Sequence, residues 1–333
     1  MTDDRFDVLG VGNAIVDMIA STEDDLLIRQ GLQKGGMALI DEPRAESLSS
    51  FMTDAIRLSG GSAANTTVGV ASFGARAAFI GKVKDDASGL AFAHDLAKAG
   101  VHFSTPAAKQ GPSTARCLVF VTPDGERTMT TYLGACQLLG SEDIDPTLVE
   151  RSAILYLEGY LWDPPAAKTA FVKAAKIAHA AGNRVALSLS DAFCVDRFRD
   201  EFLALTRDGH VDVLFANEHE IRSLYQTADF DTAIEAVQQS PLLAVVTRSE
   251  RGCVVVTAER KHEVPAFPVP TVVDTTGAGD LFAAGFLTGL SWGLDEVACA
   301  RLAAFAAAEV IQHYGARPQV SLRSLAQAAG LLS

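Results

Sequence analysis

Short apolar runs alternate with longer amphipathic stretches along most of this chain, and that alternation limits the fold more than any other feature. The apolar runs have the length of buried strands, and the stretches between them have helical spacing. We expect strands at 7–12, 77–81, 154–157, 185–189, 211–215 and 243–247, and helices at 86–98, 165–181 and 218–225. Strands joined by helices lie parallel, so the sequence predicts an α/β fold with a central, mostly parallel sheet flanked by helices.

Two segments depart from this alternation. Residues 114–133 contain two β-like runs joined by P-D-G, a strong turn signal, and residues 15–40 contain short extended pieces such as G-G-M-A-L-I. Neither segment has a crossover helix beside it, so neither suits a parallel core. We predict a small β-lid formed by about 15–45 and 112–134, as part of one domain that spans residues 1–333. A lid over a ligand crevice is also what water-excluding chemistry requires.

The composition argues against several classes of protein. A net charge of −13 over 333 residues gives no basic face for a duplex, so we expect no nucleic-acid partner. The acidic start M-T-D-D-R-F-D is unlike a signal peptide, and no apolar run reaches membrane-spanning length, so we expect no membrane association. Five cysteines occur singly, which is typical of reduced thiols in a cytoplasmic protein. The histidines show no H-x-x-x-H spacing, which argues against zinc.

The segment D-T-T-G-A-G-D-L-F-A-A-G-F-L-T-G-L at 274–290 places an acid, Asp280, at the start of an uncharged run. We expect 270–274 to be the end of a strand and 281–290 to be a helix buried on all sides. The glycines of the turn permit close approach to a ligand, and amides at a helix N-terminus bind anions. Asp280 alone also fits an N-cap. An N-cap, however, requires neither the two glycines nor an anion site beside the carboxylate.

A carboxylate next to an anion-binding turn suits phosphoryl transfer to an alcohol. The carboxylate accepts the hydroxyl proton, and the amides bind the phosphoryl group. An Asp of ordinary pKa is ionised at neutral pH and can act as this base. The P-loop pattern G-x-x-x-x-G-K-[ST] is absent from the sequence. The stretch G-V-G-N-A-I at 10–15 mimics a dinucleotide fingerprint, but Ile15 replaces its third glycine.

The segment 274–286 closely resembles the C-terminal signature of the ribokinase-like (PfkB) carbohydrate and purine kinases. A second stretch, G-G-S-A-A-N-T-T-V-G-V-A-S-F-G-A-R-A-A-F-I-G-K-V at 60–83, resembles the N-terminal signature of that family. Both motifs occur in the family's order, and N-x-x-E at 217–220 extends the resemblance, which spans nearly the whole chain. The resemblance implies a mostly parallel sheet flanked by helices with a small β-lid, in agreement with the pattern above.

By this resemblance Asp280 is the catalytic base, and the amides of Gly277, Ala278 and Gly279 form the anion hole. The acceptor side is implied to contain Asn13, Asp17, Gly60, Gly61, Ser62 and Asn65, with Asp17 holding two ribose hydroxyls. A carboxylate has two acceptor oxygens, which suits a vicinal diol. Without the resemblance, Asp17 fits a solvated loop acid, and the start of 60–65 fits a glycine turn with Ser62 as N-cap.

The resemblance also implies ATP and Mg²⁺, and in some members K⁺. Asn217 and Glu220 are placed near the phosphates and the magnesium ion, through water, although N-E-H-E also fits a capping box. In the ATP loop T-x-G-x-x-G, Thr247 and Gly252 match, while the first glycine is missing from T-R-S-E-R-G. Asp274, Thr276 and the backbone near Gly315 match positions that bind a monovalent cation in some members, and they equally fit ordinary turn residues.

Three segments resemble the adenosine kinases within this family, namely L-S-L-S-D-A-F at 187–193, V-D-V-L-F-A-N-E-H-E at 211–220 and R-T-M-T-T-Y-L-G-A at 127–135. The match places Ile15, Leu133, Tyr160 and Phe193 beside a purine, and Arg127 on the lid near the transferred phosphate. Aromatic rings give a purine flat apolar walls, although such rings also fit core packing. We expect ATP-dependent phosphorylation of the 5′-hydroxyl of adenosine, by a monomer or a homodimer.

Three alternatives stay open at this point. A kinase of the same fold acting on fructose, ribose or a sugar acid would share every motif above. A nucleoside- or sugar-binding sensor without catalysis would have no use for Asp280 as a base. A dinucleotide oxidoreductase is disfavoured by the incomplete glycine pattern at 10–15.

Overall fold

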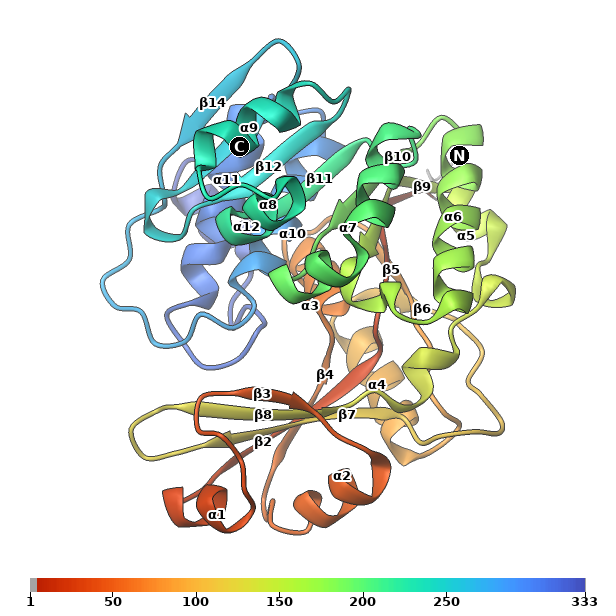
Figure 1. Ribbon diagram of the computed structural model, residues 1–333, viewed down its shortest axis with the longest axis vertical. Coiled ribbons are helices and arrows are strands. Elements are labelled where there is room, and N and C mark those ends of the chain that lie inside the picture. The colour runs from red at the N-terminus through yellow and green to blue at the C-terminus, as the bar shows by residue number, and fades with distance from the viewer. Residues whose placement is uncertain (1–4, 333) are drawn as a thin grey trace.

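A nine-stranded sheet runs through the larger part of the molecule, and it matches the predicted α/β architecture (Figure 1). Its strands are, in spatial order, β14 (Lys261–Val264), β13 (Cys253–Val256), β12 (Leu243–Thr247), β11 (Val213–Asn217), β10 (Arg184–Ser188), β9 (Ser152–Glu158), β1 (Phe6–Val11), β5 (Ala77–Ile80) and β6 (Val101–Phe103). All pairs from β12 to β6 are parallel, while β13 and β14 are antiparallel additions. The computed structural model describes residues 5–332, so the acidic start at 1–4 and Ser333 lie outside the described residues.

Two apolar clusters cover the two faces of this sheet, since successive strand side chains point to opposite faces. Val8 of β1 belongs to one cluster and Leu9 to the other. The first cluster includes α3 (Ser62–Ser72), α10 (Ala278–Ser291), α11 (Glu296–Val310), α4 (Ala87–Lys98) and α12 (Leu322–Ala328). The second includes α5 (Pro146–Glu150), α6 (Pro165–Ala180), α7 (Ala192–Arg207), α8 (Glu218–Tyr225) and α9 (Phe230–Gln238). The predicted strands and helices are therefore confirmed, with bounds that shift by one or two residues.

A second, five-stranded sheet lies beside the first and forms the lid (Figure 1). Its order is β3 (Met37–Leu39), β8 (Arg127–Tyr132), β7 (Ala115–Val121), β2 (Ile15–Ser21) and β4 (Ile56–Gly60). The short helices α1 (Asp24–Arg29) and α2 (Glu42–Ser49) accompany it. The β7–β8 hairpin turns at the predicted P-D-G, whereas β4 lies beyond the predicted lid segment of about 15–45. Within residues 5–332, no helix is long and apolar enough to cross a membrane.

Two local predictions are wrong. Residues 270–274 form no strand, because the amides of Val273 and Asp274 both donate to the carbonyl of Ile311 at the end of α11 instead of pairing with a strand. The helix that follows is as apolar and buried as expected, and it begins at Ala278. Asp17 is not a solvated loop acid, since it lies within β2 and pairs in register with Leu58 and Cys117 of the neighbouring lid strands.

Candidate active site

Asp280 lies in the first turn of α10, and its carboxylate contacts α3 rather than the backbone of its own helix. Ser62 Oγ donates to Oδ1 of Asp280 at 2.6 Å, and Asn65 Nδ2 donates to Oδ2 at 3.0 Å. The N-cap of α10 is Gly277 and the N-cap of α3 is Gly61. The capping interpretations of Asp280 and Ser62 are therefore wrong. Instead, the two signature motifs meet at one carboxylate.

Burial raises the pKa of Asp280 above its ordinary value, against the opposing effects of the Ser62 and Asn65 hydrogen bonds and the positive charge of Arg317. This corrects the expectation of an ordinary pKa. A raised pKa makes the carboxylate a stronger base for a hydroxyl proton. Burial likewise raises the pKa of Asp17 to about 6, although Arg317 and Arg127 oppose the shift. The pocket thus holds two carboxylates whose negative charges are poorly solvated.

The turn before α10 has the geometry of an anion site. Gly277 has φ of +79°, and a Cβ there would lie 2.6 Å from the Cα of Ala316, so only glycine fits. A Cβ on Gly279 would meet nothing within 4 Å, which leaves open space above the helix N-terminus. The amide of Ala278 donates to Thr275 at 3.2 Å, whereas no described backbone carbonyl accepts from the amides of Gly277 and Gly279. These two amides are the free donors.

On the acceptor side, two glycines make room for the polar groups around them. A Cβ on Gly60 would lie 2.3 Å from Oδ2 of Asp17, and a Cβ on Gly61, whose φ is +98°, would lie 2.0 Å from the carbonyl oxygen of Asn13. The glycine pair therefore brings β4 against Asp17 and brings the start of α3 against Asn13.

Several site residues carry no sequence signal. Arg317 donates from Nε to Oδ1 of Asn65 at 3.3 Å, and its Nη1 lies 2.8 Å from Oδ2 of Asp95. Its charge therefore faces both Asp17 and Asp280. Glu158, at the end of β9, binds Asn13 through both carboxylate oxygens. Arg317 and Asn65 are 252 positions apart, so no local pattern could have paired them.

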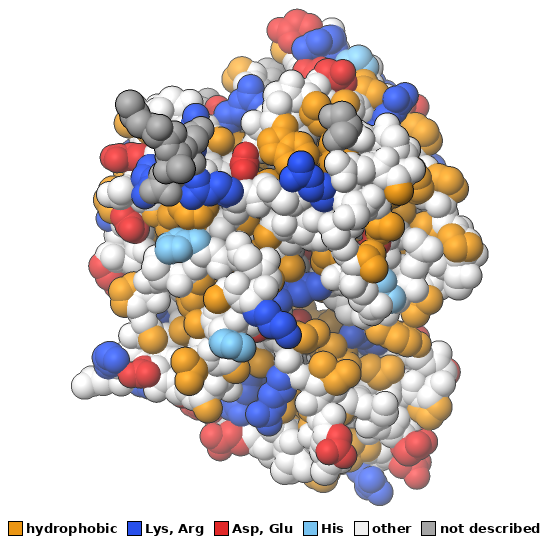
Figure 2. Space-filling model, turned by 180° about the vertical axis from the view of Figure 1, so that it is seen from behind, with side chains coloured by type: hydrophobic (Ala, Val, Ile, Leu, Met, Phe, Trp, Pro, Cys, Tyr) orange, Lys and Arg blue, Asp and Glu red, His pale blue; other side chains and the backbone are white. Residues whose placement is uncertain are grey.

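The lid meets the main sheet at a cavity of mixed polar and apolar lining. Seen from behind, the surface is hollowed between the two parts of the molecule, and Lys and Arg side chains gather there (Figure 2). A cavity between lid and main sheet is lined by polar residues of both, namely Asp17, Asn65, Arg127, Thr276 and Arg317. This junction is where the sequence predicts an acceptor.

Arg127 of the lid contacts the residues predicted to hold a monovalent cation. Its Nη1 contacts Oδ2 of Asp274 and lies 3.0 Å from Oγ1 of Thr276. Asp274 also accepts from the amide of Gly315 at 3.0 Å and from Oγ1 of Thr276 at 2.7 Å. The three residues predicted for a monovalent cation therefore do come together, with a guanidinium group on their shared carboxylate.

Two of the four predicted base-pocket residues, Tyr160 and Phe193, lie around the ends of β9 and β10. Tyr160 and Phe193 are 42% and 67% exposed, so the core-packing interpretation of these two rings is wrong. The amide of Tyr160 donates to Ser190 Oγ at 3.0 Å, and Cys194 Sγ contacts the carbonyl of Gly159 at 3.2 Å, which ties the two segments together. Ile15 at the start of β2 and Leu133 after β8 are partly buried on the lid side.

The predicted nucleotide residues lie at the ends of β11 and β12. Asn217 and Glu220 form a capping box, in which Asn217 Oδ1 accepts from the amide of Glu220 at 2.9 Å and Glu220 Oε2 accepts from the amide of Asn217 at 2.9 Å. Burial raises the pKa of Glu220 to about 7. Both side chains are engaged with each other, so they fit a magnesium ion only through water. Across residues 5–332, no cluster of three or more His, Cys, Asp or Glu side chains could hold a metal by itself.

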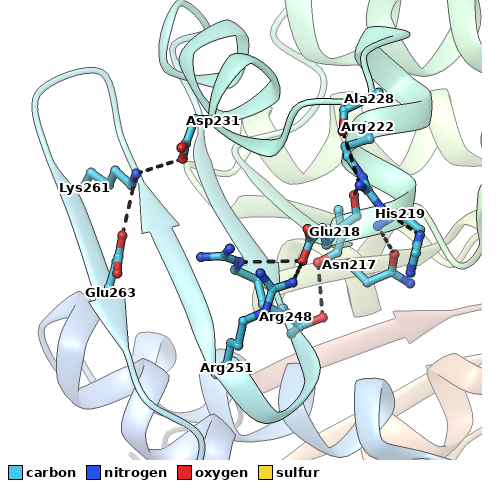
Figure 3. Close-up of polar contacts among 12 residues, drawn as sticks. Asn217, Glu218, His219, Arg222, Ala228, Asp231, Arg248, Arg251, Lys261 and Glu263 are labelled. Carbon is cyan, nitrogen blue, oxygen red and sulfur yellow. Dashed lines mark hydrogen bonds and ion pairs between the residues drawn. The ribbon is translucent and has the colours of Figure 1, made fainter.

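Two arginines flank this capping box. Figure 3 shows Arg248 and Arg251, from the turn after β12, both directed at Glu218. Arg248 Nε lies 3.6 Å from the Glu218 carboxylate, and its guanidinium group stacks 4.1 Å from the ring of Phe230. Gly252 ends this turn with φ of +83°, and a Cβ there would lie 2.1 Å from the carbonyl of Val264. Two positive charges share one carboxylate here, next to Thr247 and Asn217.

Comparison with known proteins gives the family. The model of the pfkB family of carbohydrate kinases matches residues 54–322. Among solved structures, an adenosine kinase from Sinorhizobium meliloti is 52% identical with a TM-score of 0.91, over 98% of this chain and 99% of that chain. A probable sugar kinase from Rhizobium etli CFN 42 is 50% identical with a TM-score of 0.92, over the same shares. The probable fructokinase-6 of Arabidopsis thaliana is 30% identical over 85% of this chain and 70% of that relative. The chain therefore belongs to the pfkB family of carbohydrate kinases, as its two glycine-rich motifs and the contact between them at Asp280 indicate.

Proposed function

We propose that this kinase transfers a phosphoryl group from ATP to the 5′-hydroxyl of adenosine. The observation that carries the proposal is the exposure of two rings, Tyr160 and Phe193, on segments that hydrogen bonds join at the ends of β9 and β10. Large rings exposed at the ends of these strands match the flat face of a purine, which a simple sugar lacks. The 52% identity to an adenosine kinase over nearly the whole chain supports the same acceptor.

The chemistry needs alignment, a base and charge neutralisation. The 5′-oxygen attacks the terminal phosphorus as Asp280 accepts its proton, the new O–P bond forms, and the bond to the departing ADP breaks. The amides of Gly277 and Gly279 bind the transferred phosphoryl group, and Arg127 on the lid adds a positive charge. Asp17 accepts hydrogen bonds from the two ribose hydroxyls, which fixes the 5′-carbon relative to Asp280.

Magnesium would be held through water near Asn217 and Glu220, where it would neutralise phosphate charge. Thr247, Gly252 and the two arginines beside Glu218 would face the nucleotide. A monovalent ion such as K⁺ would act at Asp274 and Thr276 once the guanidinium group of Arg127 has left the Asp274 carboxylate. We also propose that the enzyme is cytoplasmic, because its five cysteines are free thiols. We further propose that it acts in purine salvage, as a monomer or a homodimer.

A phosphorylation assay across adenosine, other nucleosides, ribose, fructose and a sugar acid tests the proposal. We expect the highest kcat/KM with adenosine. A sugar kinase is the second candidate, favoured by the 50% identity to a probable sugar kinase and by Asp17, a hydroxyl acceptor that lines the cavity between lid and main sheet. Faster phosphorylation of fructose or ribose would replace adenosine by a sugar and leave the role of Asp280 intact.

A further inference from the structure

Glu158 is a buried carboxylate within the site to which no sequence motif and no step of the proposed reaction assigns a role. It ends β9 and is 1% exposed. Burial, together with the nearby negative charge of Asp280, raises its pKa to about 7, although three hydrogen bonds to its oxygens oppose that shift. A buried carboxylate is costly unless its hydrogen bonds are satisfied, so the partners of Glu158 indicate what it is for.

Those partners are all donors. Oε2 accepts from the backbone amide of Ala63 at 2.8 Å and from the backbone amide of Asn13 at 3.3 Å. Oε1 accepts from the side-chain Nδ2 of Asn13 at 2.7 Å. One carboxylate thereby joins the loop between β1 and β2 to the first turn of α3, whose second residue is Ala63.

Gly12 is part of the same arrangement. A Cβ at this position would lie 2.2 Å from Oε2 of Glu158 and 2.8 Å from the Cβ of Ala63. Gly10 is equally close to α3, since a Cβ there would lie 2.8 Å from Cγ2 of Thr67. The glycines that imitate a dinucleotide fingerprint therefore serve to admit Glu158 and α3 against the end of β1.

The contact with Nδ2 decides which way the amide of Asn13 faces. An amide group has a donor end and an acceptor end, and a carboxylate accepts only. Glu158 therefore holds the donor end, and no described group donates to Oδ1 of Asn13. The acceptor end is the one left for a ligand. Strand β2 begins two residues after Asn13. Its third residue is Asp17, whose carboxylate also offers only acceptors.

We propose that Glu158 is a positioning residue that locks the side-chain amide of Asn13 with its oxygen toward the substrate, so that the pocket accepts a hydrogen bond from a substrate hydroxyl at this point. The inference rests on the proposed function only in taking Asn13 as a substrate contact. It deepens that function by fixing the direction of the hydrogen bonds to the substrate. Asn13 Oδ1 and the Asp17 carboxylate are both acceptors, so a substrate hydroxyl binds here only as a donor.

Glu158→Gln tests the lock, because the change removes one acceptor while keeping the shape. The two backbone amides cannot turn, so the single oxygen of the new glutamine faces them and its NH₂ group faces Asn13. The amide of Asn13 then turns over and presents NH₂ to the substrate. We expect KM for adenosine to rise about tenfold, the usual scale for one hydrogen bond, while KM for ATP and kcat stay within about threefold.

The double variant Asn13→Asp with Glu158→Gln supplies the matched rescue. One oxygen of the new aspartate accepts from the glutamine NH₂ and the other again faces the substrate, so KM for adenosine should return to within about threefold of its original value. Asn13→Asp alone sets two carboxylates against each other and should not show this recovery. Thermal unfolding and ATP binding, measured for all variants, report whether each one folds.

The proposal is overturned if the double variant is no better than Glu158→Gln, or if Glu158→Gln lowers the melting temperature with KM unchanged. The second result would make Glu158 a structural cap of α3. Failure of the proposed function appears separately, in the unaltered enzyme, as phosphorylation of a sugar in preference to adenosine. In that case the same KM comparison is made with that sugar, since the lock concerns a hydroxyl and not a purine.

Discussion

Asp280→Asn separates catalysis from folding at the position where the two signature motifs meet. Asparagine keeps the shape and one acceptor oxygen, which can still receive the hydrogen bond from Asn65. Its NH₂ group then faces Ser62, whose hydroxyl can turn and accept. The contacts therefore survive, and only the negative charge and the basic site are lost. We expect kcat to fall by about 10²–10⁴, or about 2.7–5.4 kcal/mol of transition-state stabilisation.

Stability should move in the opposite direction, because burial disfavours the charged form of this carboxylate. Removing the charge should leave the melting temperature unchanged or raise it, and ATP binding should persist by calorimetry. Asp295, the N-cap of α11, is the control: Oδ1 of its carboxylate accepts from the amide of Ala298 at 2.9 Å. Asp295→Ala should cost about 1 kcal/mol of stability with normal turnover. If Asp280→Asn instead behaves like this control, Asp280 is not the base.

Three further outcomes are expected. Asp17→Ala should weaken the binding of adenosine. It should also reduce the preference for adenosine over 2′-deoxyadenosine, which we expect to be about 1–3 kcal/mol in kcat/KM for the unaltered enzyme. An unchanged preference would show that Asp17 does not bind the ribose hydroxyls. Glu220→Gln should raise the Mg²⁺ concentration that gives half-maximal rate, whereas a change in thermal stability alone would leave only the capping box. The carboxyl pKa values of Glu158 and Glu220 rise from 4.5 to about 7 on folding, so the folded protein binds more protons in that window, and the free energy of unfolding should fall as pH rises through it. Each group contributes up to about 1.4 kcal/mol per pH unit, and denaturant titrations of Glu220→Gln should show a shallower slope.

Local patterns predicted most of the fold, and distant pairings account for what they missed. The alternating strands and helices follow from apolar periodicity, which is a property of neighbouring residues. The same reasoning failed at 270–274, where extended residues bind the end of α11 rather than a strand. Asp280 stood out because glycines surround it in the sequence. Arg317 and Glu158 did not, because their partners are Asn65 and Asn13, which are 252 and 145 positions away.

The arrangement of charge in the pocket follows from its need to accept protons and hydrogen bonds. Asp17, Asp280 and Glu158 all have pKa values raised by burial, and the negative charge of Asp280 further raises the pKa of Asp17 and of Glu158. Arg317 offsets part of the repulsion between Asp17 and Asp280 through its charge, while its own hydrogen bonds go to Asp95 and to the side-chain oxygen of Asn65. A substrate rich in hydroxyl groups would supply donors to Asp17, to which no described group donates, whereas Glu158 and Asp280 already accept from protein groups. Binding of such a substrate should therefore stabilise the folded enzyme more than its buried area alone accounts for, since it satisfies carboxylates that are otherwise poorly solvated.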